Sequence, residues 1–271
     1  MESNTISEFA HLKMPLEDIV KATNNFADEN IIGKGGFGTV YKGEIRFPSD
    51  WVSSEISCQR LDRRQGQGDV EFWTEISVLS NLDHDNILKI IGYCDVKNEK
   101  IIISNYYPKG SLSMHLTDTT NLTWNKRLMI SRGIANAITY LHQNIRRQRK
   151  IRQNYDVIHR NINSFTVLLD SRWTPILTGF EFSIKHPVDR KNHVFRCEAI
   201  GTKGYMDPEI EKTGGVTHKS DIYALGVVLF EIMCGRKAFD PKLENDNMFL
   251  APLAKIHFKN DTLQDIINPE L

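Results

Sequence analysis

The glycine-rich stretch GKGGFGTV, from Gly33 to Val40, constrains the fold of this chain more than any other feature. In the pattern G-x-G-x-x-G the backbone can lie close over an anionic group, because glycine lacks a Cβ and leaves N–H donors accessible. A dinucleotide-binding fold requires a helix directly after these glycines. Here Tyr41-Lys42-Gly43-Glu44 continues as a strand, so residues 31–46 are predicted to form a β-hairpin.

Hydrophobic periodicity places strands in the first part of the chain and helices in the second. A short helical pattern around Leu16 and Ile19 ends at Asn24–Asn25. Strands are predicted at Ser54–Leu61, Ile87–Tyr93 and Lys100–Tyr106, and helices at Asp69–Leu82, Leu122–His142 and His218–Cys234. The last of these is apolar nearly all round and is expected to be buried. Strands followed by helices indicate an α+β protein with two lobes.

Composition restricts the function classes. The 34 Lys and Arg residues equal the 34 Asp and Glu residues in number, so the net charge gives no support for binding to nucleic acid or to a membrane surface. The four cysteines form no C-x-x-C pair, which argues against a disulfide framework or zinc site and favours a reducing compartment. No 18-residue apolar run and no signal-peptide core are found, so neither a membrane span nor secretion is expected. The basic stretch Arg146–Arg152 is read either as a solvated loop or as a contact for an anionic partner.

A second stretch, VIHRNINSFTVLLD from Val157 to Asp170, follows the pattern H-R-D-x-K-x-x-N with changed letters. His159 and Arg160 match, whereas Asn161, Asn163 and Thr166 replace the aspartate, the lysine and the asparagine. Together with KATNNFADENIIGKGGFGTVYKG, EFWTEISVLSNLDHDNILKIIGYC, GTKGYMDPE and HKSDIYALGVVLFEIMCGRKAF, this stretch resembles the cytoplasmic domains of plant receptor-like kinases. The resemblance extends from about residue 14 to the end.

The resemblance implies a two-lobed protein-kinase fold. Its N-lobe would be an antiparallel sheet with one regulatory helix, and its C-lobe would be mainly helical and would lack its last helices. We expect a juxtamembrane-like segment over residues 1–28, an N-lobe over residues 29–106 and a truncated C-lobe over residues 107–271. The missing helices would carry an arginine that pairs with Glu209. We therefore expect reduced stability or an exposed apolar surface near Ile222–Met233.

The resemblance also implies a nucleotide site with one charge missing. Adenine and phosphates would contact Gly33, Gly35, Gly36, Phe37, Gly38, Val40, Ser57, Tyr106 and Leu168. Gln59 replaces the lysine that holds the phosphates, while its partner on the regulatory helix is kept as Glu75. Gln59 could donate to Glu75 but cannot supply positive charge. We expect at most weak ATP binding.

The groups for metal binding and proton transfer are also changed. Gly179-Phe180-Glu181 replaces D-F-G, and neither Gly179 nor Thr166 is a suitable magnesium ligand. Glu181 is a carboxylate, but it lies two positions late. Asn161 is neutral and cannot accept a proton as the aspartate would. We therefore predict that magnesium is not bound and that no catalytic set is intact.

Three functions follow from these residues. The first is a catalytically dead pseudokinase that signals by binding an active receptor-like kinase or its substrate. The second is an active or residually active ATP-dependent Ser/Thr kinase with Glu181 or another acid recruited, and the third is a degraded copy without function. The expected location is the cytoplasm, with a link to the plasma membrane only through a partner.

Two residues of the implied activation segment, Thr202 and Tyr205, keep hydroxyl groups that an active kinase could phosphorylate. In the family, Arg160 pairs with a phosphate on this segment. The other interpretation is that Arg160 binds a neighbouring carbonyl or acid. The sequence does not decide between these two roles.

Overall fold

A computed structural model of the chain describes residues 8–36, 38–46, 53–61, 68–96, 98–144, 155–187 and 194–270. Predictions for Phe37 and for the basic stretch Arg146–Arg152 fall outside these residues. Contacts divide the chain into two compact units, each described here by itself. The first unit comprises Met1–Asp83 with Leu88–Tyr107, and the second comprises His84–Ile87 with Pro108–Leu271.

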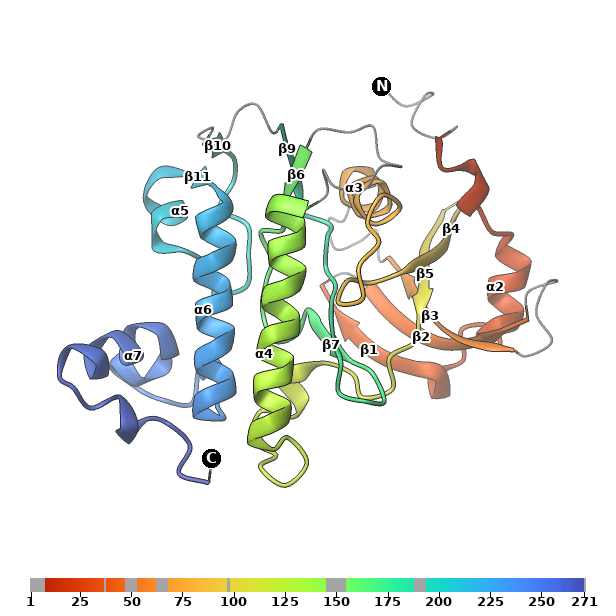
Figure 1. Cartoon of the computed structure of the whole chain (residues 1–271). Coiled ribbons are helices and arrows are strands. Elements are labelled where there is room, and N and C mark those ends of the chain that lie inside the picture. The colour runs from red at the N-terminus through yellow and green to blue at the C-terminus, as the bar shows by residue number, and fades with distance from the viewer. Residues whose placement is uncertain are drawn as a thin grey trace. The chain divides into compact units, whose positions relative to one another are not determined.

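A five-stranded antiparallel sheet forms the centre of the first unit, with strand order β1-β2-β3-β5-β4 (Figure 1). The strands are β1 (Ile31–Gly35), β2 (Gly38–Ile45), β3 (Ser54–Arg60), β4 (Ile90–Val96) and β5 (Glu99–Asn105). The helices of this unit are α2 (Leu16–Ala22), α3 (Asp69–Leu79) and the 3₁₀ turns Ala10–Leu12 and Asp28–Asn30. The predicted antiparallel sheet with one regulatory helix is confirmed.

Both faces of this sheet are covered, and strand β5 shows how. Ile101 and Ile103 join a buried cluster that includes Ile19 of α2, whereas Ile102 joins a second cluster with Phe72 of α3. Successive side chains of a strand point to opposite faces, so a continuous run of isoleucines serves two cores. Helix α2 therefore packs on one face of the sheet and α3 on the other.

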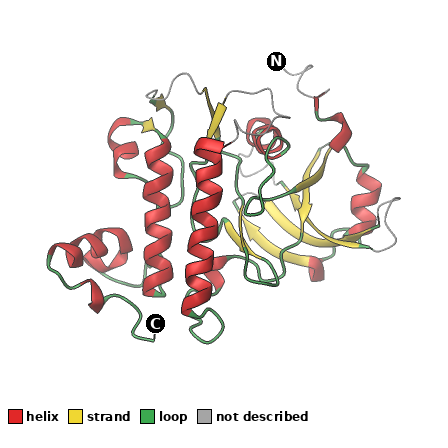
Figure 2. Ribbon diagram, in the orientation of Figure 1, coloured by secondary structure: helices red, strands yellow, loops and turns green. Residues whose placement is uncertain are grey.

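Helices dominate the second unit, with short two-stranded sheets between them (Figure 2). Its helices are α4 (Trp124–Thr139), α5 (Pro208–Thr213), α6 (His218–Cys234) and α7 (Leu250–Lys259). A π-helical turn follows at Tyr140–Asn144, and 3₁₀ turns lie at Leu112–Met114, Asn245–Met248 and Leu263–Asp265. The strands are β6 (Tyr155–Ile158), β7 (Val167–Leu169), β8 (Pro175–Leu177), β9 (Ile184–Pro187), β10 (Phe195–Arg196) and β11 (Gly215–Val216). Helices α4 and α6 pack side by side.

Helix α6 has the predicted bounds, because both ends carry local stop signals. The Thr217 hydroxyl accepts a hydrogen bond from the Lys219 N–H at 3.2 Å, and Gly235 ends the helix at a φ of 65°. The expectation of burial all round is wrong. Ile222 is 51% exposed, whereas Asp221 and Glu231 are buried, because polar partners elsewhere in the unit bind these two carboxylates.

Among the helices that the structure describes, none is long and apolar enough to cross a membrane.

Candidate functional site

The glycine-rich hairpin is formed by β1 and β2. Gly33 pairs with Val40 and Gly35 pairs with Gly38, whose φ of 93° needs a residue without a Cβ. A Cβ added to Gly35 or Gly36 would meet no atom within 4 Å. These glycines therefore give an open backbone surface, as the resemblance implies for a phosphate loop.

The other predicted nucleotide contacts of the first unit lie on neighbouring strands. Gln59 of β3 is opposite Val40, and Ser57 is opposite Lys42. Tyr106 follows β5, and the Lys42 ammonium lies 4.5 Å from the centre of its ring. Glu75 lies on the buried face of α3, with 3% of its side chain exposed. A hydrogen bond from Gln59 to Glu75 stays a prediction.

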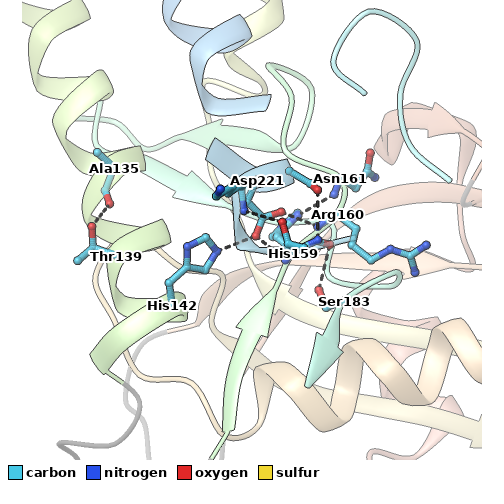
Figure 3. A network of polar contacts seen from close by, with 11 residues as sticks. Ala135, Thr139, His142, His159, Arg160, Asn161, Ser183 and Asp221 are labelled. Carbon is cyan, nitrogen blue, oxygen red and sulfur yellow. Dashed lines mark hydrogen bonds and ion pairs between the residues drawn. The ribbon is translucent and has the colours of Figure 1, made fainter. Parts of the chain in front are cut away.

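In the second unit, Asp221 of α6 fixes the backbone of the loop that follows β6 (Figure 3). Its carboxylate accepts hydrogen bonds from the N–H groups of His159 at 2.8 Å and Arg160 at 2.9 Å, and from Nε2 of His142 at 2.8 Å. Burial alone would raise the pKa of Asp221, but these bonds and the histidines lower it. The φ of Arg160 is 72°, a conformation that this support holds in place.

His159 is held as a neutral imidazole. Its Nε2–H donates to the Thr178 carbonyl at 3.0 Å, and its Nδ1 accepts from the Asn161 N–H at 3.2 Å. Its ring lies edge-on to Phe180 at a centroid distance of 4.5 Å. Burial lowers the pKa of His159 to about 4, with the charge of Asp221 opposing this. A proton on Nδ1 would break the bond to Asn161, so the neutral ring orients the loop.

Asn161, at the position of the implied base, is bonded through both ends of its side-chain amide. Its Nδ2 donates to Oε1 of Glu181 at 3.0 Å. Its Oδ1 accepts from the Thr202 hydroxyl at 2.9 Å and from Nδ2 of Asn163 at 3.0 Å. Asn161 and Glu181 are both buried. This closed network joins the loop after β6 to the segment after β8.

The positions implied for magnesium do not fit a magnesium ion. Gly179 has no ligand atom, its φ is 83°, and a Cβ placed on it would lie 2.7 Å from Cγ2 of Thr166. The Thr166 hydroxyl donates to the carbonyls of Asn161 and Asn163, at 3.0 and 3.1 Å. Hard cations such as magnesium need several unengaged oxygen ligands in octahedral geometry. Within the described ranges, no group of three or more His, Cys, Asp or Glu residues could hold a metal ion.

Arg160 binds backbone carbonyls of the same segment. Its Nη1 donates to the Phe182 carbonyl at 3.1 Å and its Nη2 donates to the Glu198 carbonyl at 3.0 Å. Of the two roles left open by the sequence, this arrangement agrees with the binding of a neighbouring carbonyl.

The two candidate phosphorylation sites have bonded hydroxyl groups. The Thr202 hydroxyl lies in the Asn161 network, and Tyr205 is buried with its Oη donating to Oε1 of Glu231 at 2.6 Å. Burial and the nearby carboxylate raise the pKa of Tyr205. Phosphorylation of either residue stays a prediction, and it would require these bonds to break.

The expected stability loss at Glu209 rests on a wrong premise. Glu209 is exposed in α5, so the cost of burying an unpaired charge does not arise there. The apolar surface expected along α6 is present at Ile222.

Three side chains with structural roles were not found from the sequence. Glu231 accepts hydrogen bonds from Tyr205, from the Ser164 hydroxyl and from the Ala238 N–H. Arg127 donates to three backbone carbonyls. Glu181 pairs with Asn161. A charged residue within an apolar helical pattern is the signal for the first two.

Comparisons with known proteins agree with this geometry. Residues 26–255 match the family model described as protein tyrosine and serine/threonine kinase. The chain is 37% identical to the receptor-like protein kinase ANXUR2 of Arabidopsis thaliana over 261 residues, which are 96% of this chain and 29% of that protein. It is 36% identical to the Arabidopsis thaliana serine/threonine-protein kinase CDG1 over 261 residues, covering 94% of this chain and 57% of that protein.

For the Arabidopsis thaliana receptor-like protein kinase FERONIA, the identity is 36% over 256 residues, covering 94% of this chain and 27% of that protein. The chain therefore spans less than two thirds of the length of each of these relatives. Its glycine-rich hairpin, its regulatory helix and its Asp221-supported loop occur in the matched region. The chain belongs to the protein tyrosine and serine/threonine kinase family and is a protein kinase-like domain of the receptor-like class.

Proposed function

We propose that this domain is a pseudokinase, which transfers no phosphate and acts in signalling by binding another protein. The observation that supports this most is the state of Asn161. Its neutral amide replaces the aspartate of the family pattern, and both ends are bonded, to Glu181 and to Thr202 and Asn163. Such a side chain cannot take the proton of a substrate hydroxyl.

The size of the expected defect follows from the number of altered groups. A positioned general base contributes about 10²–10⁴-fold to a rate. Here the phosphate-binding lysine, the base and both metal ligands are replaced, by Gln59, Asn161, Thr166 and Gly179. Such effects are not additive. Even one of them leaves little activity, and the four together remove charge, ligand atoms and base from one reaction.

We infer that ATP binds weakly and without magnesium, if it binds at all. The open hairpin of Gly33, Gly35 and Gly38 supplies backbone donors, but Gln59 supplies no charge to the phosphates. The partner we propose is an active receptor-like kinase or one of its substrates. The proposed location is the cytoplasm, at the plasma membrane only through that partner.

Calorimetry with ATP tests the nucleotide part of the proposal. The chain is titrated with ATP in EDTA and then in excess magnesium. We expect the two dissociation constants to agree within about twofold, because the residues at the metal positions offer no suitable ligands. An affinity at least about tenfold higher in magnesium would contradict this. A chain with Gly33→Leu and Gly35→Leu identifies heat that does not come from the hairpin.

One contact favours the second function, a residually active Ser/Thr kinase. The Glu181 carboxylate lies 3.0 Å from Nδ2 of Asn161, so an acid is present beside the position of the missing base. Phosphotransfer that disappears with Glu181→Gln would support this function. Phosphotransfer that is unchanged by Glu181→Gln would exclude Glu181 as the base.

A further inference from the structure

The N-terminal strap, which we define as residues 9–22, packs along the sheet of the first unit. The sequence suggested a juxtamembrane-like segment separate from the N-lobe. Instead the strap contributes to both cores of that unit through Phe9 and Ile19. It precedes residue 26, where the match to the family model begins.

Phe9, at the start of the strap, belongs to the core that contains α3. Its side chain is 3% exposed and clusters with Phe72, Ile76, Tyr93 and Ile102. Phe72 and Ile76 are four residues apart and therefore lie on one face of α3. Burying an aromatic ring beside this face stabilises the position of the helix against the sheet.

The strap crosses strand β4 at Gly92. The Met14 N–H donates to the Tyr93 carbonyl at 2.8 Å, and Lys13 forms a parallel bridge with Tyr93. A Cβ placed on Gly92 would lie 2.7 Å from the Leu12 carbonyl oxygen and 2.6 Å from Sδ of Met14. This crossing therefore requires a glycine on β4.

Helix α2, which ends the strap, is anchored separately. Ile19 is fully buried in the other core of the sheet. A Cβ on Gly43 of β2 would lie 3.1 Å from the Ala22 carbonyl oxygen, so a second glycine allows close approach of the strap. With one end fixed by Ile19, the other end presents Phe9 to α3 at little further loss of chain entropy.

We propose that the strap is an intramolecular clamp that holds α3, the helix carrying Glu75, against the sheet. Removal of Phe9 from its cluster loosens α3 and exposes the aromatic face formed by Phe72 and its neighbours. A partner that binds the strap thereby controls α3. The clamp is independent of whether the domain transfers phosphate.

Hydrogen exchange of the full chain tests this clamp. Gly92→Ala forces the strap away from β4 without removing an apolar atom from the α3 core. We expect amides of Asp69–Leu79 to exchange at least about tenfold faster, while amides of α6 in the second unit are unchanged. Gly35→Ala, in the same sheet, adds a Cβ that meets no atom within 4 Å, and it should leave α3 unchanged.

A second pair of variants separates the clamp from a general loss of folding. Phe9→Ala should increase α3 exchange as Gly92→Ala does, and Phe9→Leu should restore most of the protection. Val70→Ala on α3, where the side chain is 74% exposed, is the matched control. Unchanged α3 exchange in both Gly92→Ala and Phe9→Ala would overturn the proposal. An equal increase in both units would also overturn it, because the strap would then support the whole chain.

Discussion

Asn161→Asp is expected to lower the free energy of unfolding by about 3 kcal/mol at pH 8, which corresponds to a melting temperature roughly 6–12 °C lower. The substitution restores the residue of the family pattern, yet it replaces the amide that donates to Glu181. Two buried carboxylates would then face each other at about the distance of a hydrogen bond. The Thr202 hydroxyl and Asn163 still supply donors to the other oxygen.

The loss should depend on pH in a direction that identifies its cause. Repulsion and burial raise the pKa of the introduced carboxyl in the folded chain, so the folded state binds more protons than the unfolded state above about pH 4. Stability therefore falls as pH rises from the unfolded pKa toward the raised folded pKa. Melting curves at pH 4.5 and pH 8 should show a small deficit at the lower pH and the full deficit at the higher pH.

The control reverses the polarity of the pair. In the double variant Asn161→Asp with Glu181→Gln, the new amide can donate to the new carboxylate, and most of the stability should return. Asn121→Asp is the exposed counterpart, because Nδ2 of Asn121 donates to Asp118 at 2.9 Å at the surface. It should change the melting temperature by no more than about 2 °C. An Asn161→Asp deficit that neither depends on pH nor responds to Glu181→Gln would contradict the proposed repulsion.

Arg127→Ala is expected to lower the free energy of unfolding by about 3–5 kcal/mol. Arg127 is fully buried near the start of α4. Its guanidinium donates to the carbonyls of Leu122 at 2.9 Å, Ile232 at 2.6 Å and Leu116 at 3.0 Å. Ile232 lies in the last turn of α6, where carbonyls lack partners within the helix. Truncation would leave these buried acceptors unsatisfied and create a cavity.

Urea denaturation of the full chain measures this loss. Arg127→Lys should recover only part of it, because one ammonium cannot reproduce the geometry of the guanidinium fork. Arg132→Ala removes an exposed arginine from the same helix and should change stability by less than about 0.5 kcal/mol. Equal effects of Arg127→Ala and Arg132→Ala would show that the three carbonyls do not depend on Arg127.

The sequence predicted element types better than it predicted their limits. The bounds of α6 follow from Thr217 and Gly235, which are local signals. Strand β4 was predicted at Ile87–Tyr93 but lies at Ile90–Val96, because Ile87 instead forms a bridge with Leu177 in the second unit. A continuous apolar run does not tell which of its residues pair within one sheet.

The candidate site could be predicted as a set of substitutions but not as a network. Asn161 and Gly179 were identifiable because the family pattern assigns each position a charge or a ligand atom. That the amide of Asn161 would bond to Glu181, and that Thr166 would occupy the space beside Gly179, depends on backbone geometry absent from the sequence.

The central claim is that this kinase fold no longer transfers phosphate, and single-turnover phosphotransfer tests it most directly. Excess chain is mixed with labelled ATP, magnesium or manganese, and a generic protein substrate. We predict that incorporation equals that of a chain with Gly33→Leu, Gly35→Leu and Gly38→Leu, and that Asn161→Asp alone does not raise it. Incorporation by the unmodified chain that disappears in the glycine variant would contradict the claim.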